Sequence, residues 1–135
     1  MGQQQLLLII LGVIVVGIAV AVGITMFSDS AINANRDALA NDLVNLASRA
    51  QQFYRRPVSL GGGGNDFGKL TLITQLTNNT SNANGTYSLK AAGSGAGITA
   101  PGVQIIGVGT ENYNGAPVSV GVDVFADRDS VYTLH

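Results

Sequence analysis

The sequence predicts an α+β protein in which one long N-terminal helix, apolar in its first half and amphipathic in its second, packs on a small antiparallel β-sheet head. Three observations lead to this fold class. Residues 6–27 form an unbroken apolar run, residues 28–56 repeat apolar side chains at helical spacing without Gly or Pro, and residues 57–135 contain segments with strand alternation. The chain therefore divides into a long helix over residues 1–56 and a Gly-rich head that helix residues 28–56 complete.

The first half of the helix has the length of a membrane span. The segment from Leu6 to Phe27 contains no charged residue and no proline. Its 22 residues would extend about 33 Å as a helix, close to the apolar thickness of a bilayer. A removable secretory signal has a basic start and a shorter apolar run, and this chain has neither. Arg36 is the first basic residue, so the charge rule leaves the orientation of the span open.

The second half of the helix carries one apolar stripe. Nothing interrupts the helical pattern between Phe27 and Pro57, which cannot continue a helix. The stripe consists of Ile32, Leu39, Leu43, Leu46, Ala50 and Phe53. We expect it to dock on the head, because a remainder of 79 residues with 14 glycines has a thin core of its own. Gly61 to Gly64 are expected to form a flexible joint.

The head is predicted to be an antiparallel sheet whose apolar face the helix stripe covers. Its clearest strand contains Val118, Val120, Val122 and Val124, which alternate with small or polar residues. The candidate strands are residues 85–92, 102–110, 116–126 and 130–135. Residues 69–76 are ambiguous between a strand and a short helix.

The connections between these strands have turn and loop composition. Asn114-Gly115 and residues 127–129 are predicted hairpin turns. Residues 78–85 and 93–97 are rich in Asn, Ser and Gly and are predicted loops.

Composition and spacing argue against enzymatic and cofactor-binding functions. A formal net charge of -1 provides no basic surface for nucleic acid. The absence of cysteine excludes disulfides, thiolate catalysis and cysteine metal sites. No cluster of nucleophile, acid and base has catalytic spacing, and His135 is the only histidine. The segment 61–69 lacks the spacing and the Ser or Thr of a phosphate-binding loop. We therefore expect no enzyme, no cofactor and no nucleic-acid partner.

Two weaker patterns concern ions and sugars. Asp123, Asp127 and Asp129, together with Glu111, supply the oxygen ligands that calcium prefers, although a solvated turn explains them more simply. The Asn-x-Ser/Thr pattern of N-glycosylation applies only in a cell that glycosylates its surface proteins. It occurs at Asn78, Asn79 and Asn84.

The chain as a whole resembles type IV pilins and related pilin-like filament subunits. The resemblance is architectural: an uncharged apolar stretch continues into an amphipathic helix and then into a small Gly-rich antiparallel head. It implies a subunit held first in the inner membrane, subject to methylation and handled by pilus assembly machinery. The subunit would then join copies of itself in an extracellular helical homopolymer. The expected assembly-core residues are Leu6, Ile10, Val13, Val16, Val20, Ile24 and Phe27.

Individual residues match the family pattern only in part. Such subunits often mature by cleavage after a glycine, and Gly2 followed by Gln3 is similar to the archaeal form of that junction. Many bacterial pilins carry a glutamate inside the apolar stretch, whereas the first glutamate here is Glu111. If Met1 begins the mature chain, Gln5 occupies that position. An amide cannot form a charge pair with a neighbour's terminal amine, so amide hydrogen bonds would have to replace it.

The resulting expectation is a structural filament subunit, with two alternatives. One is a single-pass membrane-anchored binding or sensory module, and the other is a minor pseudopilin of a secretion system. Anchored modules usually leave the membrane through a flexible linker, whereas this chain leaves it through a helix with an apolar face. Gly12, Gly17 and Gly23 favour close helix packing in an apolar environment over local loosening.

Overall fold

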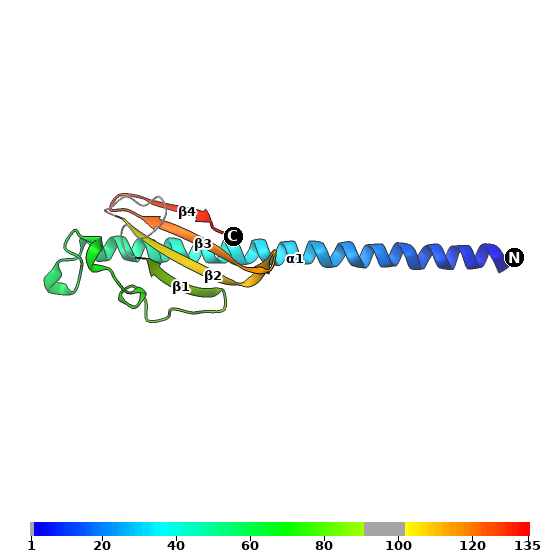
Figure 1. Cartoon of the computed structure of the whole chain (residues 1–135), viewed down its shortest axis with the longest axis horizontal. Coiled ribbons are helices and arrows are strands. Elements are labelled where there is room, and N and C mark those ends of the chain that lie inside the picture. The colour runs from blue at the N-terminus through cyan, green and yellow to red at the C-terminus, as the bar shows by residue number, and fades with distance from the viewer. Residues whose placement is uncertain (1, 91–101) are drawn as a thin grey trace.

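The computed structural model describes residues 2–90 and 102–135 (Figure 1). One helix, α1, runs the length of the molecule, and a four-stranded sheet lies against its second half. The elements are α1 (Gly2–Arg55), the short 3-10 helices η1 (Val58–Leu60), η2 (Phe67–Lys69) and η3 (Ile73–Gln75), and the strands β1 (Gly85–Lys90), β2 (Val103–Tyr113), β3 (Ala116–Val124) and β4 (Asp129–Thr133). The predicted α+β fold class is confirmed.

Helix α1 is continuous across the boundary between its apolar and amphipathic halves. Its 54 residues correspond to a length of about 81 Å. It ends at Arg55, two residues before Pro57, because the proline ring restricts the preceding residue and removes a backbone donor. The predicted helix and its end are confirmed.

The glycine segment after α1 is a helix cap, which corrects the predicted flexible joint. The backbone N–H of Gly63 donates to the Phe53 carbonyl at 2.8 Å, and that of Gly64 donates to the Arg56 carbonyl at 2.9 Å. These bonds tie the glycine segment back to carbonyls at and just after the last turn of α1, where the helix itself supplies few donors. A side chain on Gly62 would collide with the backbone of Arg56, so this close return requires glycine.

The sheet is an antiparallel meander in the order β1-β2-β3-β4. Strands β2 and β3 are joined at the predicted turn, where Asn114 and Gly115 both have positive φ, as a two-residue type I′ hairpin requires. The β3–β4 turn is closed by a 2.8 Å bond from the Phe125 N–H to the Arg128 carbonyl. The ambiguous segment 69–76 contains no strand and includes η3. The predicted loop at 93–97 and the end of the first predicted strand lie outside the described residues.

The helix stripe and the inner face of the sheet form one core. All six predicted stripe residues are buried, and Leu39 and Leu43 have no exposed surface. The four valines of β3 that were predicted to face the helix are also buried. Close approach is possible because Gly109 lies on β2, where any side chain would collide with Asn35 of α1. The core residues are Ile32, Leu39, Leu43, Leu46, Ala47, Ala50, Phe53, Phe67, Leu70, Leu76, Tyr87, Val103, Ile105, Val118, Val120, Val122 and Val124.

Candidate functional site

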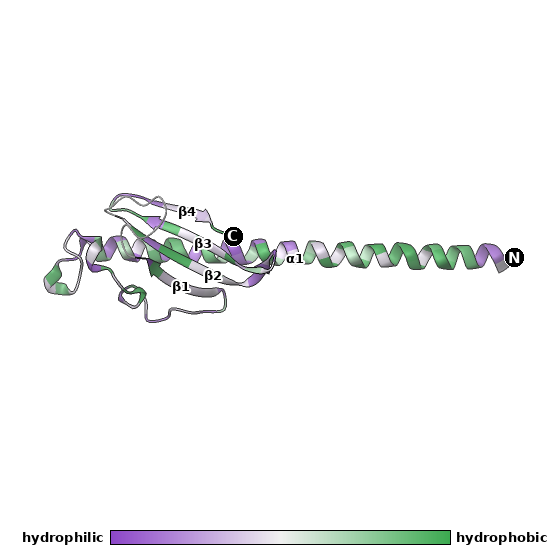
Figure 2. Cartoon of the chain, in the orientation of Figure 1, coloured by the Kyte–Doolittle hydropathy of each residue, from purple (hydrophilic) through white to green (hydrophobic). Residues whose placement is uncertain are grey.

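The candidate functional surface is the apolar half of α1, which projects beyond the head and is uncovered (Figures 1 and 2). Its large hydrophobic side chains are all more than half exposed, from 51% at Val22 to 78% at Phe27. Together these side chains form one continuous apolar surface that is larger than the apolar patches on soluble monomeric proteins. The helix is long and apolar enough to cross a membrane.

The predicted assembly-core residues all lie on this uncovered half. Their spacing of three and four residues places them along one side of the helix. They are Leu6, Ile10, Val13, Val16, Val20, Ile24 and Phe27. Leu8 and Val15, on other sides of the helix, are exposed to a similar degree. The surface is therefore apolar all round, as expected of a helix buried on every side in lipid or among other helices.

Gly12, Gly17, Gly23 and Thr25 of this half contact no other element in the described part of the chain. Around Gly12, Gly17 and Gly23, a Cβ atom would meet nothing within 4 Å. The packing of the single chain therefore does not explain these glycines. The hydroxyl of Thr25 donates to the Ala21 carbonyl at 3.1 Å, so it is satisfied within the helix. The segment thus offers no unpaired polar side chain to a bilayer or to a neighbouring helix.

The candidate processing junction lies at the free end of the helix. Gly2 and Gln3 belong to the first turn of α1, and both are exposed. The head lies at the opposite end of the molecule (Figure 1). A protease acting at this junction would therefore meet no obstruction from the described part of the head.

A polar cluster around Asp42 joins the head to α1, and the sequence analysis did not identify it. Asp42 Oδ2 accepts hydrogen bonds from Asn82 Nδ2 at 3.0 Å, from Asn84 Nδ2 at 2.9 Å and from the Tyr87 hydroxyl. Two turns earlier on α1, Asn35 Nδ2 donates to the Asn84 carbonyl at 2.9 Å. The cluster holds the loop before β1 against the helix. Its only sequence signal is an Asp beside a stripe leucine and an Asn-rich loop.

The Asp42 carboxylate is stabilised in its charged form. Burial alone would raise its pKa, but the hydrogen bonds from Asn84, Tyr87 and Asn82 together outweigh burial and lower the pKa of Asp42 below its ordinary value of 3.8. Burial, followed by the bond to Asp42, raises the pKa of Tyr87. The phenol therefore stays protonated and remains a donor.

Replacing Asp42 with Asn should lower the free energy of unfolding by about 1–2 kcal/mol at pH 7, because the loop donors lose a charged acceptor that is partly shielded from water. The folded pKa lies below the unfolded one, so the stabilisation is present above about pH 4 and is lost as the pH falls through the folded pKa. Thermal unfolding of the detergent-solubilised chain at pH 7 and pH 2 measures both effects. Asp37→Asn, on the exposed surface of α1, is the control. An Asp42→Asn deficit of equal size at both pH values would contradict this account.

The three candidate glycosylation sites differ in accessibility. Asn78 and Asn79 are exposed in the loop after η3. Asn84 is half-buried, and its Nδ2 atom, to which a sugar would be attached, donates to Asp42. A sugar at Asn84 would remove that bond, so Asn78 and Asn79 are the positions that can accept one without disturbing the head.

The candidate calcium ligands do not converge, which corrects the weaker of the two interpretations given for them. Asp123 accepts a 3.0 Å hydrogen bond from the hydroxyl of Tyr132. Asp127 and Asp129 lie exposed at the β3–β4 turn, and Glu111 lies on β2. Within the described part of the chain, no three acidic or histidine side chains gather where they could hold a metal ion.

His135 packs where α1 leaves the head. Its Nε2 atom lies 2.8 Å from the Tyr113 carbonyl oxygen, and the two rings meet edge to face at 5.9 Å. On the same tyrosine ring, the Arg36 guanidinium lies 5.0 Å from the centroid. These contacts give the histidine a packing role beside the β2–β3 hairpin.

Comparison of the chain with protein-family models, curated proteins and solved structures yields no match. What the molecule does must therefore be inferred from its own geometry.

Proposed function

We propose that the chain is the structural subunit of an extracellular, type IV pilus-like filament, assembled through the apolar half of α1. The observation that carries the proposal is a continuous helix with two different halves. Residues 32–53 are buried against the sheet on one side, whereas residues 6–27 are apolar on all sides and bury none of their large side chains. A segment of this kind must be covered by lipid or by other helices.

Both coverings belong to the proposed mechanism. The subunit waits in the inner membrane with residues 6–27 spanning the bilayer, and pilus assembly machinery then moves it into the filament. There the same segment packs against copies of itself, and the heads form the outer surface. Lipid tails and neighbouring helices are equally apolar, so hydrophobicity alone supplies little net free energy for this exchange. Close packing, head contacts and the assembly machinery set its direction.

The glycines of the apolar half support packing between copies. Gly12, Gly17 and Gly23 have open space on their Cβ side in the single chain. Small residues let the backbones of neighbouring helices approach closely where no water drives association. A helix that only anchored the head in lipid would gain nothing from these glycines and would lose helix stability at each of them.

A membrane-anchored binding or sensory module is the weaker candidate. Such a module is usually separated from its anchor by a flexible linker, so that anchor and head move independently. Here α1 passes from the apolar half into the head core without interruption, and Ile32 is already buried five residues after Phe27. Axial rigidity of this kind suits a polymer in which head and core positions must be in register.

Electron microscopy of material sheared from cells that produce the chain tests the proposal. We expect thin, uniform filaments that an antibody against the head labels along their length. They should be absent from cells in which the gene is deleted. Label confined to short structures at the envelope would favour a minor pseudopilin, and label that stays with the membrane fraction would favour an anchored module.

A further inference from the structure

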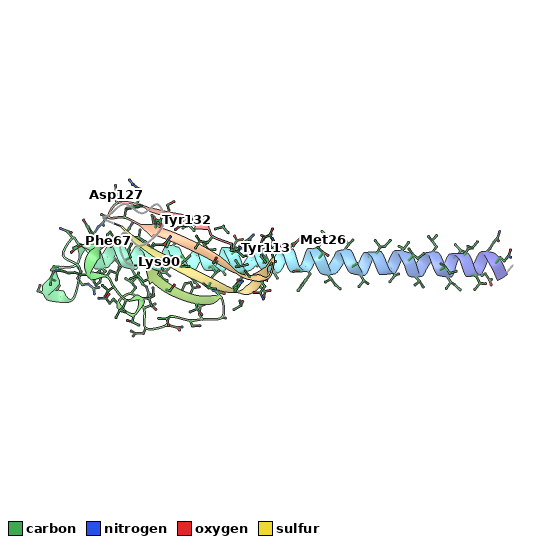
Figure 3. All side chains as sticks on the ribbon, in the orientation of Figure 1. Met26, Phe67, Lys90, Tyr113, Asp127 and Tyr132 are labelled. Carbon is green, nitrogen blue, oxygen red and sulfur yellow. The ribbon has the colours of Figure 1, made fainter. Side chains whose placement is uncertain are left out.

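A groove lined by two arginines and a group of exposed carboxylates lie at opposite ends of the head. At the distal end, where α1 stops, lie Arg49, Arg55, Arg56 and Lys69, with Asp66. The β3–β4 turn, with Asp127, Arg128 and Asp129, lies at the same end (Figure 3). At the neck, where α1 leaves the head, three acidic residues that we call the neck carboxylates accompany Arg36, whose guanidinium lies over the Tyr113 ring. These are Asp29, Asp37 and Glu111, all exposed. Figure 3 shows the two ends, with Phe67 and Asp127 at the distal end, Tyr113 at the neck, and Met26 farther along the projecting part of α1.

The distal end also contains a groove lined by two arginines. Arg49 and Arg56 are two turns apart on one face of α1, and both line a hollow of about 300 Å³, which we call the distal groove. Its remaining wall comes from Gln52 and Phe53 of α1 and from Gln75 and Leu76 at η3. Among the described residues, no carboxylate lines it.

The two arginines are available to a ligand. Arg49 uses one nitrogen to donate to the Leu76 carbonyl at 3.2 Å, which holds its side chain at the groove. Each guanidinium carries five donors in a planar fork. Within residues 2–90 and 102–135, the Leu76 carbonyl is the acceptor of the Arg49 side chain and no acceptor pairs with that of Arg56, so the other donors can bond an anion. That fork matches the two oxygens of a carboxylate.

We propose that the distal groove binds a neck carboxylate of a second copy of this chain. This inference rests on the proposed filament function and identifies one of its contacts. Charge complementarity between the two arginines of the distal groove and the neck carboxylates of the same chain supports a copy of the chain as the partner. Because groove and neck are different surfaces, the contact is heterologous. Two joined copies still present one free groove and one free neck, so the contact can repeat along a filament.

The spacing along α1 fits this contact. Asp29 and Asp37 precede Arg56 by distances of about 40 and 28 Å along the helix. Two parallel copies joined from groove to neck would therefore be offset by roughly 30–40 Å. The apolar half is about 33 Å long. At an offset of about 28 Å the apolar halves of successive copies overlap by about 5 Å, and at about 40 Å they are about 7 Å apart, so the apolar core of the filament is close to continuous at either offset.

The test compares two adjacent arginines. Arg56 lines the groove, whereas Arg55 lies outside it and donates to the Ala126 carbonyl at 3.4 Å. We expect Arg56→Glu to lower the yield of sheared filaments at least tenfold while the amount of subunit in the membrane is unchanged. Arg55→Glu makes the same charge change and should lower the yield less than twofold.

Charge exchange then identifies the partner residue. Arg56→Glu is combined in turn with Asp29→Arg, Asp37→Arg and Glu111→Arg, and we expect one combination to restore at least a third of the normal yield. Parent filaments should also release subunits faster in 1 M than in 0.05 M NaCl, because salt screens the contact. Thermal unfolding of each solubilised variant shows that the head is still folded.

Each outcome separates the two proposals. If the parent chain forms no filaments, the proposed function is wrong. If parent filaments form and Arg56→Glu assembles normally, or if no exchange restores the yield, the groove contact is wrong and the proposed function stands. If Arg56→Glu filaments form normally but no longer retain an added polyanion such as DNA, the groove serves a different anion and the contact between copies is overturned.

Discussion

A chain carrying Val15→Asp is expected to form no detectable filaments. Val15 lies near the middle of the uncovered apolar half, where its side chain is 55% exposed in the single chain. Packing between copies would place an aspartate there in a dry helical bundle without a charged partner. An unpaired charge in such surroundings costs several kcal/mol, and about 3 kcal/mol per subunit already corresponds to roughly a hundredfold loss in an assembly equilibrium.

The measurement separates assembly from membrane insertion. The sheared fraction and the membrane fraction are quantified for the parent chain, for Val15→Asp and for Val15→Ala. The alanine variant removes only methyl groups and should keep most of the filament yield. A charge at the centre of a span also lowers insertion, so filament yield is normalised to the subunit present in the membrane. Normal yield from inserted Val15→Asp subunits would contradict a core built from residues 6–27.

The main elements of the fold could be predicted because their signals are local. The absence of charged residues and proline identifies the apolar half. Apolar residues three or four positions apart identify the stripe, and the alternating valines of β3 identify a strand that is buried on one face. The stripe of α1 and the valines of β3 are both apolar surfaces that must be shielded from water, and each can bury the other. The docking of helix on sheet follows from that shared requirement.

The sequence did not predict features of the structure that depend on backbone hydrogen bonds or on polar groups far apart in the chain. Four consecutive glycines indicate flexibility by composition. Whether their N–H groups find acceptors depends on the path of the chain, and here the Phe53 carbonyl at the end of α1 accepts one of them. The Asp42 cluster joins groups 40 or more residues apart, and no periodic pattern reports such a contact. The distal groove could not be predicted for the same reason, because its walls come from α1 and from η3, which are far apart in the sequence.

The docking of α1 on the sheet should dominate the stability of the head, and Leu43→Ala measures it. Leu43 has no exposed surface, so its truncation should lower the free energy of unfolding by about 2–5 kcal/mol. Val44→Ala is the control on the neighbouring position, where the side chain is 43% exposed and the expected loss is well below 1 kcal/mol. We expect the apolar half to remain helical in detergent when the head unfolds, so hydrogen exchange of the β2 and β3 amides is the measurement that reports on the head alone.

Removing the helix altogether is the most stringent test that the sheet depends on α1 for its stability. A fragment that begins at Ser28 retains the stripe and should be soluble and folded. One that begins at Pro57 lacks the stripe and leaves Val118, Val120 and the rest of the inner sheet face in water, so it should be largely unfolded. Thermal unfolding and amide hydrogen exchange distinguish the two states. Cooperative melting of the shorter fragment at the same temperature as the longer one would show that the sheet needs no helix.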